Sequence, residues 1–275
     1  MNGQFALVTG LHWGAVACYV VATLCAVTGV IFKSEKSERY GLIIAIPGLL
    51  LHGIALLIWW RIVGHGPYMD RFEVLSSNAW VMLALFLPAI RFYPRLRSAA
   101  VVVFPATFFL VALGLFLRPE IKNLPASYRG YWLILHIVFY KISFAATLIA
   151  VTFSIFYLLA TGKSPRRLSF LPEPDVMDLY AYRFASFGFI FWVIGMLAGS
   201  IWAYQSLNMF WSWEPVQIWS LVTWVLFGLY LHMRRFYGWA GRKAAWLYIL
   251  CFALAVFSLF VTPFINSSIH SEYFK

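Results

Sequence analysis

The chain has 275 residues, of which 63% are hydrophobic and only 11% are charged. Soluble domains carry charge on roughly a quarter of their residues, so this composition excludes an ordinary soluble protein and predicts one embedded in a lipid bilayer. The formal net charge of +11 would suggest nucleic-acid binding in a soluble protein. In a membrane protein the distribution of the cations over the loops matters more than their sum, and we expect no nucleic-acid partner.

Apolar runs long enough to cross a bilayer, about 20 residues each, recur along the whole chain. They predict an all-α integral membrane protein with eight transmembrane helices near 6–32, 41–61, 76–92, 98–117, 131–161, 181–205, 216–236 and 245–266. The third run is the weakest, because Pro88 interrupts it and Arg91 ends it early, so seven spans is the alternative. The first run lacks a basic leader and is too long for a cleaved signal peptide, which predicts a retained span.

Lysine and arginine alternate between the loops. The richer loops hold Lys33, Lys36 and Arg39, then Arg91, Arg95 and Arg97, then Lys163, Arg166 and Arg167, then Arg234, Arg235, Arg242 and Lys243. The sparser connections hold Arg61 and Arg71, then Arg118, Lys122 and Arg129, and finally Lys275. Cytoplasmic loops retain the excess of basic residues. Both termini and the loops at 62–75, 118–130 and 203–215 are therefore expected outside the cytoplasm, in a multi-pass protein of the inner (plasma) membrane.

No soluble segment separates two halves, which predicts one membrane domain over residues 1–275. The longest polar connection, at 161–180, contains Ser164-Pro165-Arg166-Arg167 and Pro172-Glu173-Pro174-Asp175, which favour turns over helix. The cysteines Cys18, Cys25 and Cys251 lie in apolar runs and form no Cys-x-x-Cys-His motif. The chain therefore has no c-type haem attachment site of its own, and packing between helices is the expected role of the three thiols.

The segment 203–215 and the start of the next span are unusually rich in aromatic residues. Tryptophan and tyrosine gather at membrane interfaces, which explains part of this density. Pro215 after Glu214 suits the first turn of a helix, so the seventh span is expected to begin there. Trp211 and Trp213 then precede the helix and form a non-helical aromatic shelf, on which a large flat apolar ligand would fit.

One face of the seventh span joins this shelf to a histidine. Gln217, Ser220, Trp224 and His232 fall within an arc of roughly 120° on a helix. His232 would lie about 22 Å from the shelf, near the cytoplasmic side. A histidine at such depth needs a partner, and both a packing role and a ligand role stay open.

Four of the six histidines are expected toward the outside. His136 lies one turn beyond Trp132 on the same helix face, His270 follows the last span, His65 lies in an outer loop and His12 lies near the start of the first span. Histidine is a frequent axial ligand of haem iron. Two histidines from separate helices beside an aromatic shelf would form a bis-imidazole haem site, whereas the short His-x-x-x-His spacing typical of zinc is absent.

These residues resemble a known family. The stretch from Trp211 to Trp219 is similar to the tryptophan-rich "WWD" segment of the haem-handling proteins of cytochrome c biogenesis, in the CcsA (ResC-like) branch. Further similarities are Trp132-Leu-Ile-Leu-His136, Leu231-His232, Asn266-Ser-Ser-Ile-His270 and the loop Gly64-His65-Gly66-Pro67.

The resemblance implies a haem route across the membrane. Non-covalent b-type haem would be received near His232 and moved to an outer site ligated by His136 and His270. There the tryptophan segment 203–215 would grip the ring, with Trp219, Trp224, Trp132, Glu214 and His65 as further cofactor-binding candidates. The haem would be joined to the Cys-x-x-Cys-His motif of an apocytochrome c, with a CcsB-like (ResB-like) partner, so that the chain would be a subunit of a cytochrome c synthase.

The sequence departs from the family pattern at several positions. The stretch Leu207-Asn208-Met209-Phe210-Trp211 stands where the family has Trp-Gly two positions before an aromatic-tryptophan pair. Glu214 replaces an aspartate, and Gln217 stands at a second acidic position. His52, near the middle of the second span, could substitute for a histidine that the partner supplies, or could be a packing residue. Lys141 lies within the fifth span on the face opposite His136 and calls for a partner.

Two other functions stay open. One is a haem b subunit that passes electrons between quinol and an extracytoplasmic cytochrome, using the same histidines as a relay. The other is a non-catalytic regulator of haem metabolism, as in shorter relatives of the family.

Overall fold

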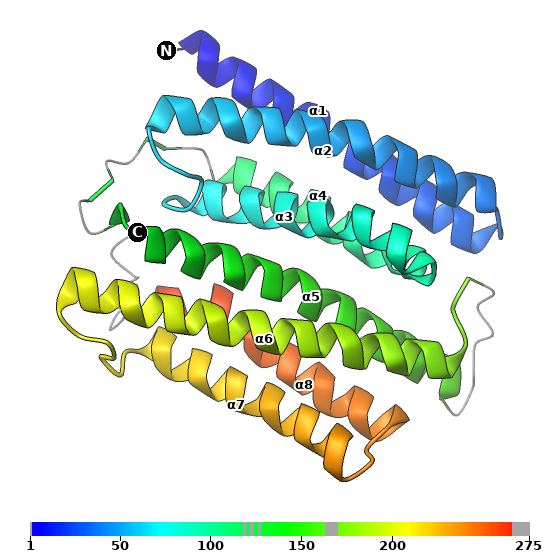
Figure 1. Ribbon diagram of the computed structural model, residues 1–275. Coiled ribbons are helices and arrows are strands. Elements are labelled where there is room, and N and C mark those ends of the chain that lie inside the picture. Colours follow the sequence, from blue (N-terminus) through cyan, green and yellow to red (C-terminus); the bar gives the residue numbers. More distant parts are fainter. Residues whose placement is uncertain (1, 118–119, 122–123, 126–127, 163–169, 266–275) are drawn as a thin grey trace. The chain divides into compact units, whose positions relative to one another are not determined.

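The computed structural model describes residues 2–117, 120–121, 124–125, 128–162 and 170–265. In these residues it contains eight α-helices and no β-strand (Figure 1). The helices are α1 (Asn2–Ile31), α2 (Glu35–Val63), α3 (Arg71–Phe92), α4 (Ala100–Phe116), α5 (Tyr131–Thr161), α6 (Pro174–Leu207), α7 (Pro215–Phe236) and α8 (Gly241–Phe260). A short 3₁₀ helix, η1 (Pro94–Ala99), leads into α4.

The prediction of eight membrane-spanning helices is confirmed, because eight helices are long and apolar enough to cross a bilayer. The third span is a continuous helix despite Pro88, and Pro47 and Pro105 also lie inside helices. Proline is tolerated there because neighbouring groups can satisfy the carbonyl that it frees. The helices extend past the apolar runs at several ends. In particular, α6 begins at Pro174 in a stretch predicted to be a loop, because proline is well suited to the first helical turn.

The chain divides into two compact units. Unit 1 comprises Met1–Leu124 with Leu168–Leu171, and unit 2 comprises Pro125–Arg167 with Pro172–Lys275. The single membrane domain and the location of both termini outside the cytoplasm stay predictions.

Small residues bring α1 and α2 of unit 1 together. Ala15, Ala22 and Ala26 of α1 are fully or almost fully buried. A side chain at Gly41 would meet the carbonyl oxygen of Ala22 at 2.9 Å, and one at Gly48 would meet the Tyr19 ring at 2.7 Å. Close backbone approach of this kind is how helices associate within a membrane, where the lipid is as apolar as the side chains.

In unit 2, α5 packs along α6 and α8, and α7 packs on α6 and α8. At one end of the unit, the Asp178 carboxylate of α6 accepts hydrogen bonds from two guanidinium nitrogens of Arg234, each at 2.7 Å. It also accepts a hydrogen bond from the backbone N–H of Gly241 at 2.9 Å. Arg234 also lies over the Tyr182 ring, 5.0 Å from its centroid. This one carboxylate therefore ties the beginnings of α6 and α8 to the end of α7.

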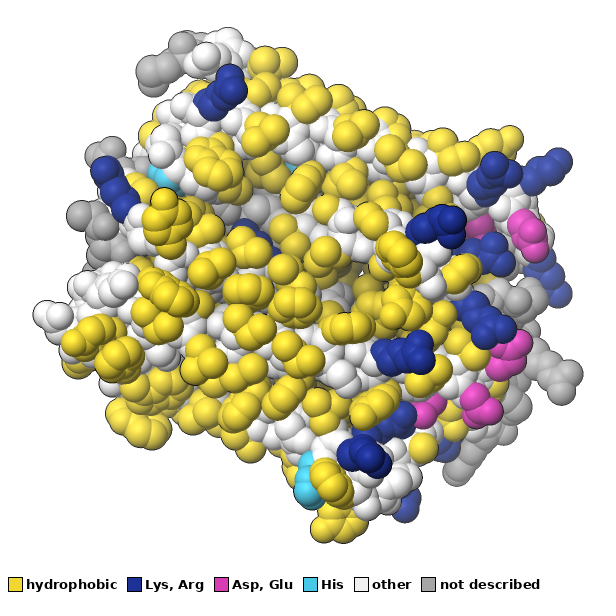
Figure 2. All heavy atoms as spheres, viewed as in Figure 1, with side chains coloured by type: hydrophobic (Ala, Val, Ile, Leu, Met, Phe, Trp, Pro, Cys, Tyr) yellow, Lys and Arg dark blue, Asp and Glu magenta, His cyan; other side chains and the backbone are white. Residues whose placement is uncertain are grey.

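The surface agrees with a lipid environment. Large apolar side chains such as Leu24, Leu50, Leu57, Phe109 and Leu197 are about half exposed. Figure 2 shows apolar side chains over the middle of the helices and lysine and arginine side chains toward the helix ends. Such helices, apolar around their circumference, are typical of membrane spans.

Candidate functional site: a histidine and tryptophan cavity in unit 2

Unit 2 contains a partly open cavity where α5 begins, α6 ends and α7 begins, with ≈ 550 Å³ of empty space when the adjoining open solvent is included. The walls combine a histidine, large aromatic side chains and a few polar groups, and include His136, Tyr140, Trp202, Trp211, Glu214, Gln217 and Ser220. The structure thus brings together three predicted site residues, namely His136, Trp211 and Glu214.

The His136 ring packs against α6 at two glycines, Gly195 and Gly199. Its Nδ1 lies 2.8 Å from the carbonyl oxygen of Gly195. Since a carbonyl can only accept, Nδ1 carries the hydrogen, and the lone pair of the neutral ring is on Nε2. A Cβ atom on Gly199 would lie 2.3 Å from Nδ1. The spacing Gly195-x-x-x-Gly199 therefore provides both the acceptor and the room for this imidazole.

A second contact links His136 to α7. The Tyr140 ring, one turn along α5, lies edge-on to the His136 ring with centroids 4.9 Å apart. The Tyr140 hydroxyl bonds the Ser220 hydroxyl of α7. The Trp192 indole N–H of α6 donates to the carbonyl and hydroxyl oxygens of Ser220 at 3.1 Å. Three helices therefore determine the position of the histidine.

The segment 208–214 between α6 and α7 is non-helical, as predicted for Trp211 and Trp213, whereas 203–207, expected in the same loop, form the last turn of α6. Asn208, the C-cap of α6, and Trp213 both have positive φ values, 55° and 57°. Tyr204 and Phe210 stack at 4.2 Å, and Trp211 meets Trp213 edge to face at 5.8 Å. Trp213 is 68% exposed, so the outer surface of this segment is aromatic and accessible.

Gln217 attaches this segment to α7. Its Oε1 accepts the backbone N–H of Ser212 at 2.7 Å and the Ser212 hydroxyl at 3.2 Å. The acidic side chain that the family pattern has at position 217 could accept the same two hydrogen bonds from Ser212. Glutamine in its place therefore keeps the segment attached to α7. Glu214 is buried at the N-cap of α7, and Pro215 begins the helix as predicted.

The other predicted aromatic residues of unit 2 lie outside the cavity wall. Trp219 packs against Phe257 at 4.8 Å. Trp224 stacks on Phe189 at 5.5 Å, and its indole N–H is buried without a hydrogen-bond partner in the described part of the chain. Trp132 is half-buried near the start of α5.

His232 lies near the far end of α7, where it is exposed and contacts Phe236 and Tyr237, with ring centroids 4.8 and 5.6 Å away. His270 is outside the described residues. Lys141 is buried within α5.

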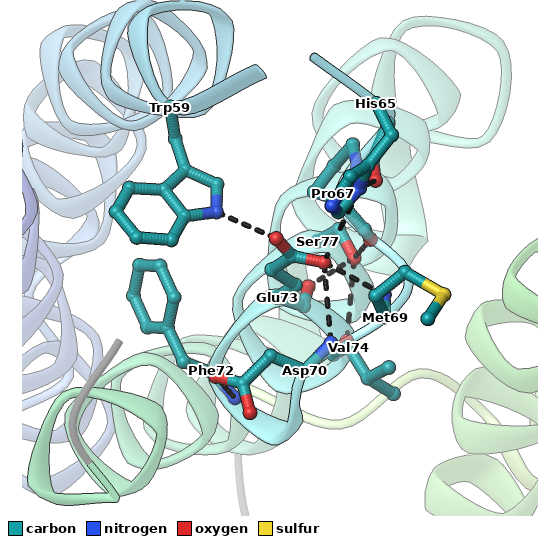
Figure 3. A network of polar contacts seen from close by, with 10 residues as sticks. Trp59, His65, Pro67, Met69, Asp70, Phe72, Glu73, Val74 and Ser77 are labelled. Atoms are coloured by element: carbon teal, nitrogen blue, oxygen red, sulfur yellow. Dashed lines mark hydrogen bonds and ion pairs between the residues drawn. The ribbon is translucent and has the colours of Figure 1, made fainter. Parts of the chain in front are cut away.

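His65 lies in unit 1, at a loop organised by a buried carboxylate (Figure 3). Glu73 accepts hydrogen bonds from the Trp59 indole at 2.7 Å and from the backbone N–H groups of Met69 and Asp70 at 2.7 and 3.2 Å. His65 Nδ1 donates to the Gly66 carbonyl at 2.8 Å and lies 3.9 Å from Glu73. Its Nε2 is buried with no partner among the residues described.

His52 also lies in unit 1, in a buried chain of hydrogen bonds whose protons can be assigned. His12 Nδ1 donates to the carbonyl of Val8 at 2.8 Å, so its Nε2 accepts from the Ser76 hydroxyl at 3.1 Å. The Ser76 oxygen then accepts from His52 Nε2 at 2.8 Å, and His52 Nδ1 accepts from the Tyr19 hydroxyl at 3.2 Å. Both imidazoles are neutral and fully paired, which favours the packing role for His52.

Several site residues are not among the sequence predictions. Tyr140, Trp192, Gly195 and Gly199 help to hold His136, and each contact joins two helices. Ser220 was predicted only as part of the helix face that leads to His232, not as a contact of Tyr140. The only signal that could have found part of this set is the Gly-x-x-x-Gly spacing, which permits close helix packing in membranes.

Comparison with known proteins identifies the family of the chain. The family model described as "Cytochrome C assembly protein" matches residues 43–270. The chain belongs to this family.

Its relatives include proteins named "Cytochrome c biogenesis protein CcsA". The protein from Prochlorococcus marinus (strain AS9601) is 28% identical over 273 residues, which cover 88% of this chain and 87% of the relative. The Chlamydomonas reinhardtii protein is 29% identical over 244 residues, covering 83% and 68%. The chain is therefore similar to CcsA proteins over most of its length.

A solved structure with a similar fold is "Cytochrome c Heme Lyase CcmF", with a TM-score of 0.73 at 16% identity. The match covers 98% of this chain, which spans about half (48%) of that protein.

Proposed function

We propose that this chain binds haem in the cavity of unit 2, with His136 as an axial ligand, and presents it for the assembly of c-type cytochromes. The observation that carries the proposal is the environment of His136. Its Nδ1 donates to the Gly195 carbonyl within a cavity lined by tryptophan and tyrosine. A ligating histidine typically donates its second ring N–H to such an acceptor, which fixes the ring and its tautomer.

The residues present fit a porphyrin. The large aromatic side chains of the cavity wall suit a flat apolar ring, and the imidazole supplies an iron ligand. His270 is the proposed second ligand on the same side. The bound haem is proposed to be b-type and non-covalent until its transfer.

Haem supplies the vinyl groups and the iron chemistry, and the protein supplies binding and orientation. In our proposal, Tyr140 and two glycines of α6 hold His136, and the 203–215 segment covers the ring and faces an apocytochrome c. The distribution of basic residues supports a site on the extracytoplasmic side of the plasma membrane. Membership in the family supports a CcsB-like membrane protein as the partner, and His232 is the proposed inner contact of the haem.

Expression with a CcsB-type protein and a reporter apocytochrome c tests the proposal. We expect haem to co-purify with the chain and covalent haem to form on the reporter, and His136→Ala to abolish both. His52→Ala is the matched histidine control, because His52 is bonded by Ser76 and Tyr19; it should leave haem per folded molecule unchanged, with the folded fraction measured in parallel. Haem binding that survives His136→Ala would refute the proposed site. Bound haem that is reduced by quinol and never transferred would favour an electron-transfer subunit instead.

A further inference from the structure

The side-chain amide of Gln217 has one defined orientation. Its Oε1 accepts the backbone N–H and the hydroxyl of Ser212. Because a backbone N–H can only donate, the oxygen must occupy that end of the amide, and the other end is the NH₂ group with two donors. Gln217 also lines the unit 2 cavity. Gln217 therefore offers hydrogen-bond donors at the cavity wall, while its oxygen fixes the segment that contains Ser212.

A second donor belongs to the same wall. Trp211 lines the cavity, and its indole N–H is buried with no hydrogen-bond partner among the residues that the structure describes. An indole N–H can only donate. A buried donor without an acceptor is unfavourable, so a ligand that offers an acceptor gains affinity by pairing with it.

Other polar groups of the cavity already have partners. His136 Nδ1 donates to Gly195, and Tyr140 and Ser220 bond each other. Glu214 also lines the cavity, but it is buried at the N-terminus of α7, where the positive end of the helix dipole offsets its charge. The ligand group that best matches this wall is therefore an acceptor, and a carboxylate is the strongest acceptor that biological ligands offer.

We propose that Trp211 and Gln217 form a carboxylate-binding subsite of the cavity. The inference rests on the proposed function, in which the ligand is haem and the carboxylate is one of its two propionates. This subsite would fix the rotation of the porphyrin in its own plane, which an axial histidine alone leaves undetermined.

Porphyrin binding to the detergent-solubilised full-length chain tests the subsite. The two probes are ferric haem and its dimethyl ester, which keeps the ring and iron but has no free carboxylate. We expect the unchanged chain to bind the free acid about tenfold more tightly than the ester, the effect of one charge-assisted hydrogen bond. Gln217→Glu keeps an acceptor for Ser212 but places a negative charge beside the propionate. This variant should weaken binding of the free acid about tenfold and leave the ester unchanged.

Trp211→Phe keeps the ring contact and removes the N–H, so it should reduce the preference for the free acid severalfold. This variant keeps the test informative if Gln217→Glu does not fold. Equal affinity of the unchanged chain for acid and ester, lost in His136→Ala, would overturn the subsite and leave the proposed function intact. Failure of both porphyrins to bind, or binding that His136→Ala does not affect, would overturn the proposed function itself.

Discussion

Unit 1 and unit 2 both place histidines within transmembrane helices, but their surroundings differ. In unit 1, His12 and His52 are fully buried and share the hydroxyl of Ser76 in a chain whose protons are all accounted for. In unit 2, His136 is partly exposed in a cavity wall, and its Nδ1 is bonded to a backbone carbonyl. Buried polar groups that satisfy one another specify a packing arrangement, whereas a fixed imidazole at a cavity is suited to a ligand.

The comparison predicts that stability and haem binding can be altered separately. Changes in the Ser76 network should lower the stability of the fold without altering haem affinity. Changes around His136 should lower haem affinity and have a smaller effect on the stability of the fold.

The largest expected effect is that of Ser76→Ala. Two buried imidazole nitrogens lose their partner, and each unsatisfied group costs about 1–3 kcal/mol. We expect the free energy of unfolding to fall by about 2–4 kcal/mol, measured by denaturation in mixed micelles. Haem affinity per folded molecule should not change.

Ser154→Ala is the control for that experiment, because this buried serine donates to the carbonyl of Ala150 in its own helix. Its removal should cost less than about 1 kcal/mol. Equal destabilisation by the two variants would contradict the special role of the Ser76 hydroxyl.

The next effect in size is that of Gly199→Ala. The new methyl group would lie 2.3 Å from His136 Nδ1, so the imidazole must move out of its position. Overpacking forces side chains out of their preferred positions, so we expect haem affinity to fall about tenfold to a hundredfold, measured by titration of the Soret absorbance.

Gly228→Ala in α7 is the matched control, because its methyl group would meet Phe189 at an ordinary 3.5 Å. It should leave haem affinity unchanged. A Gly199→Ala chain that binds haem normally would show that His136 does not need its observed position.

Much of the fold follows from the sequence, because each span is a local run of apolar residues and needs no tertiary information. The start of α7 at Pro215 was likewise predictable from local helix-capping rules. The beginning of α6 was not, because the same Pro-Glu-Pro-Asp stretch suits both a turn and a first helical turn.

The site was only partly predictable for a physical reason. His136 and Trp211 could be predicted as site residues, because histidine is rare within apolar spans and Trp211 lies in a segment unusually rich in aromatic residues. Tyr140 and Ser220 are 80 residues apart, and their contact depends on how α5 and α7 pack. Likewise, nothing in the local sequence distinguishes His52, satisfied by Ser76 and Tyr19, from a histidine that binds a ligand.

The smallest expected effect is that of Tyr140→Phe in unit 2, which tests whether the hydrogen bond between α5 and α7 helps to position His136. Tyr140→Phe keeps the ring beside His136 and removes only the hydroxyl that bonds Ser220. A single hydrogen bond contributes about 0.5–1.5 kcal/mol, so we expect haem affinity to fall about twofold to tenfold with a small shift of the Soret band. Ser220→Ala should act through the same bond. The double variant should therefore lose less affinity than the two single losses combined, as coupled residues do. Fully additive losses would mean that the bond between α5 and α7 does not help to hold the histidine.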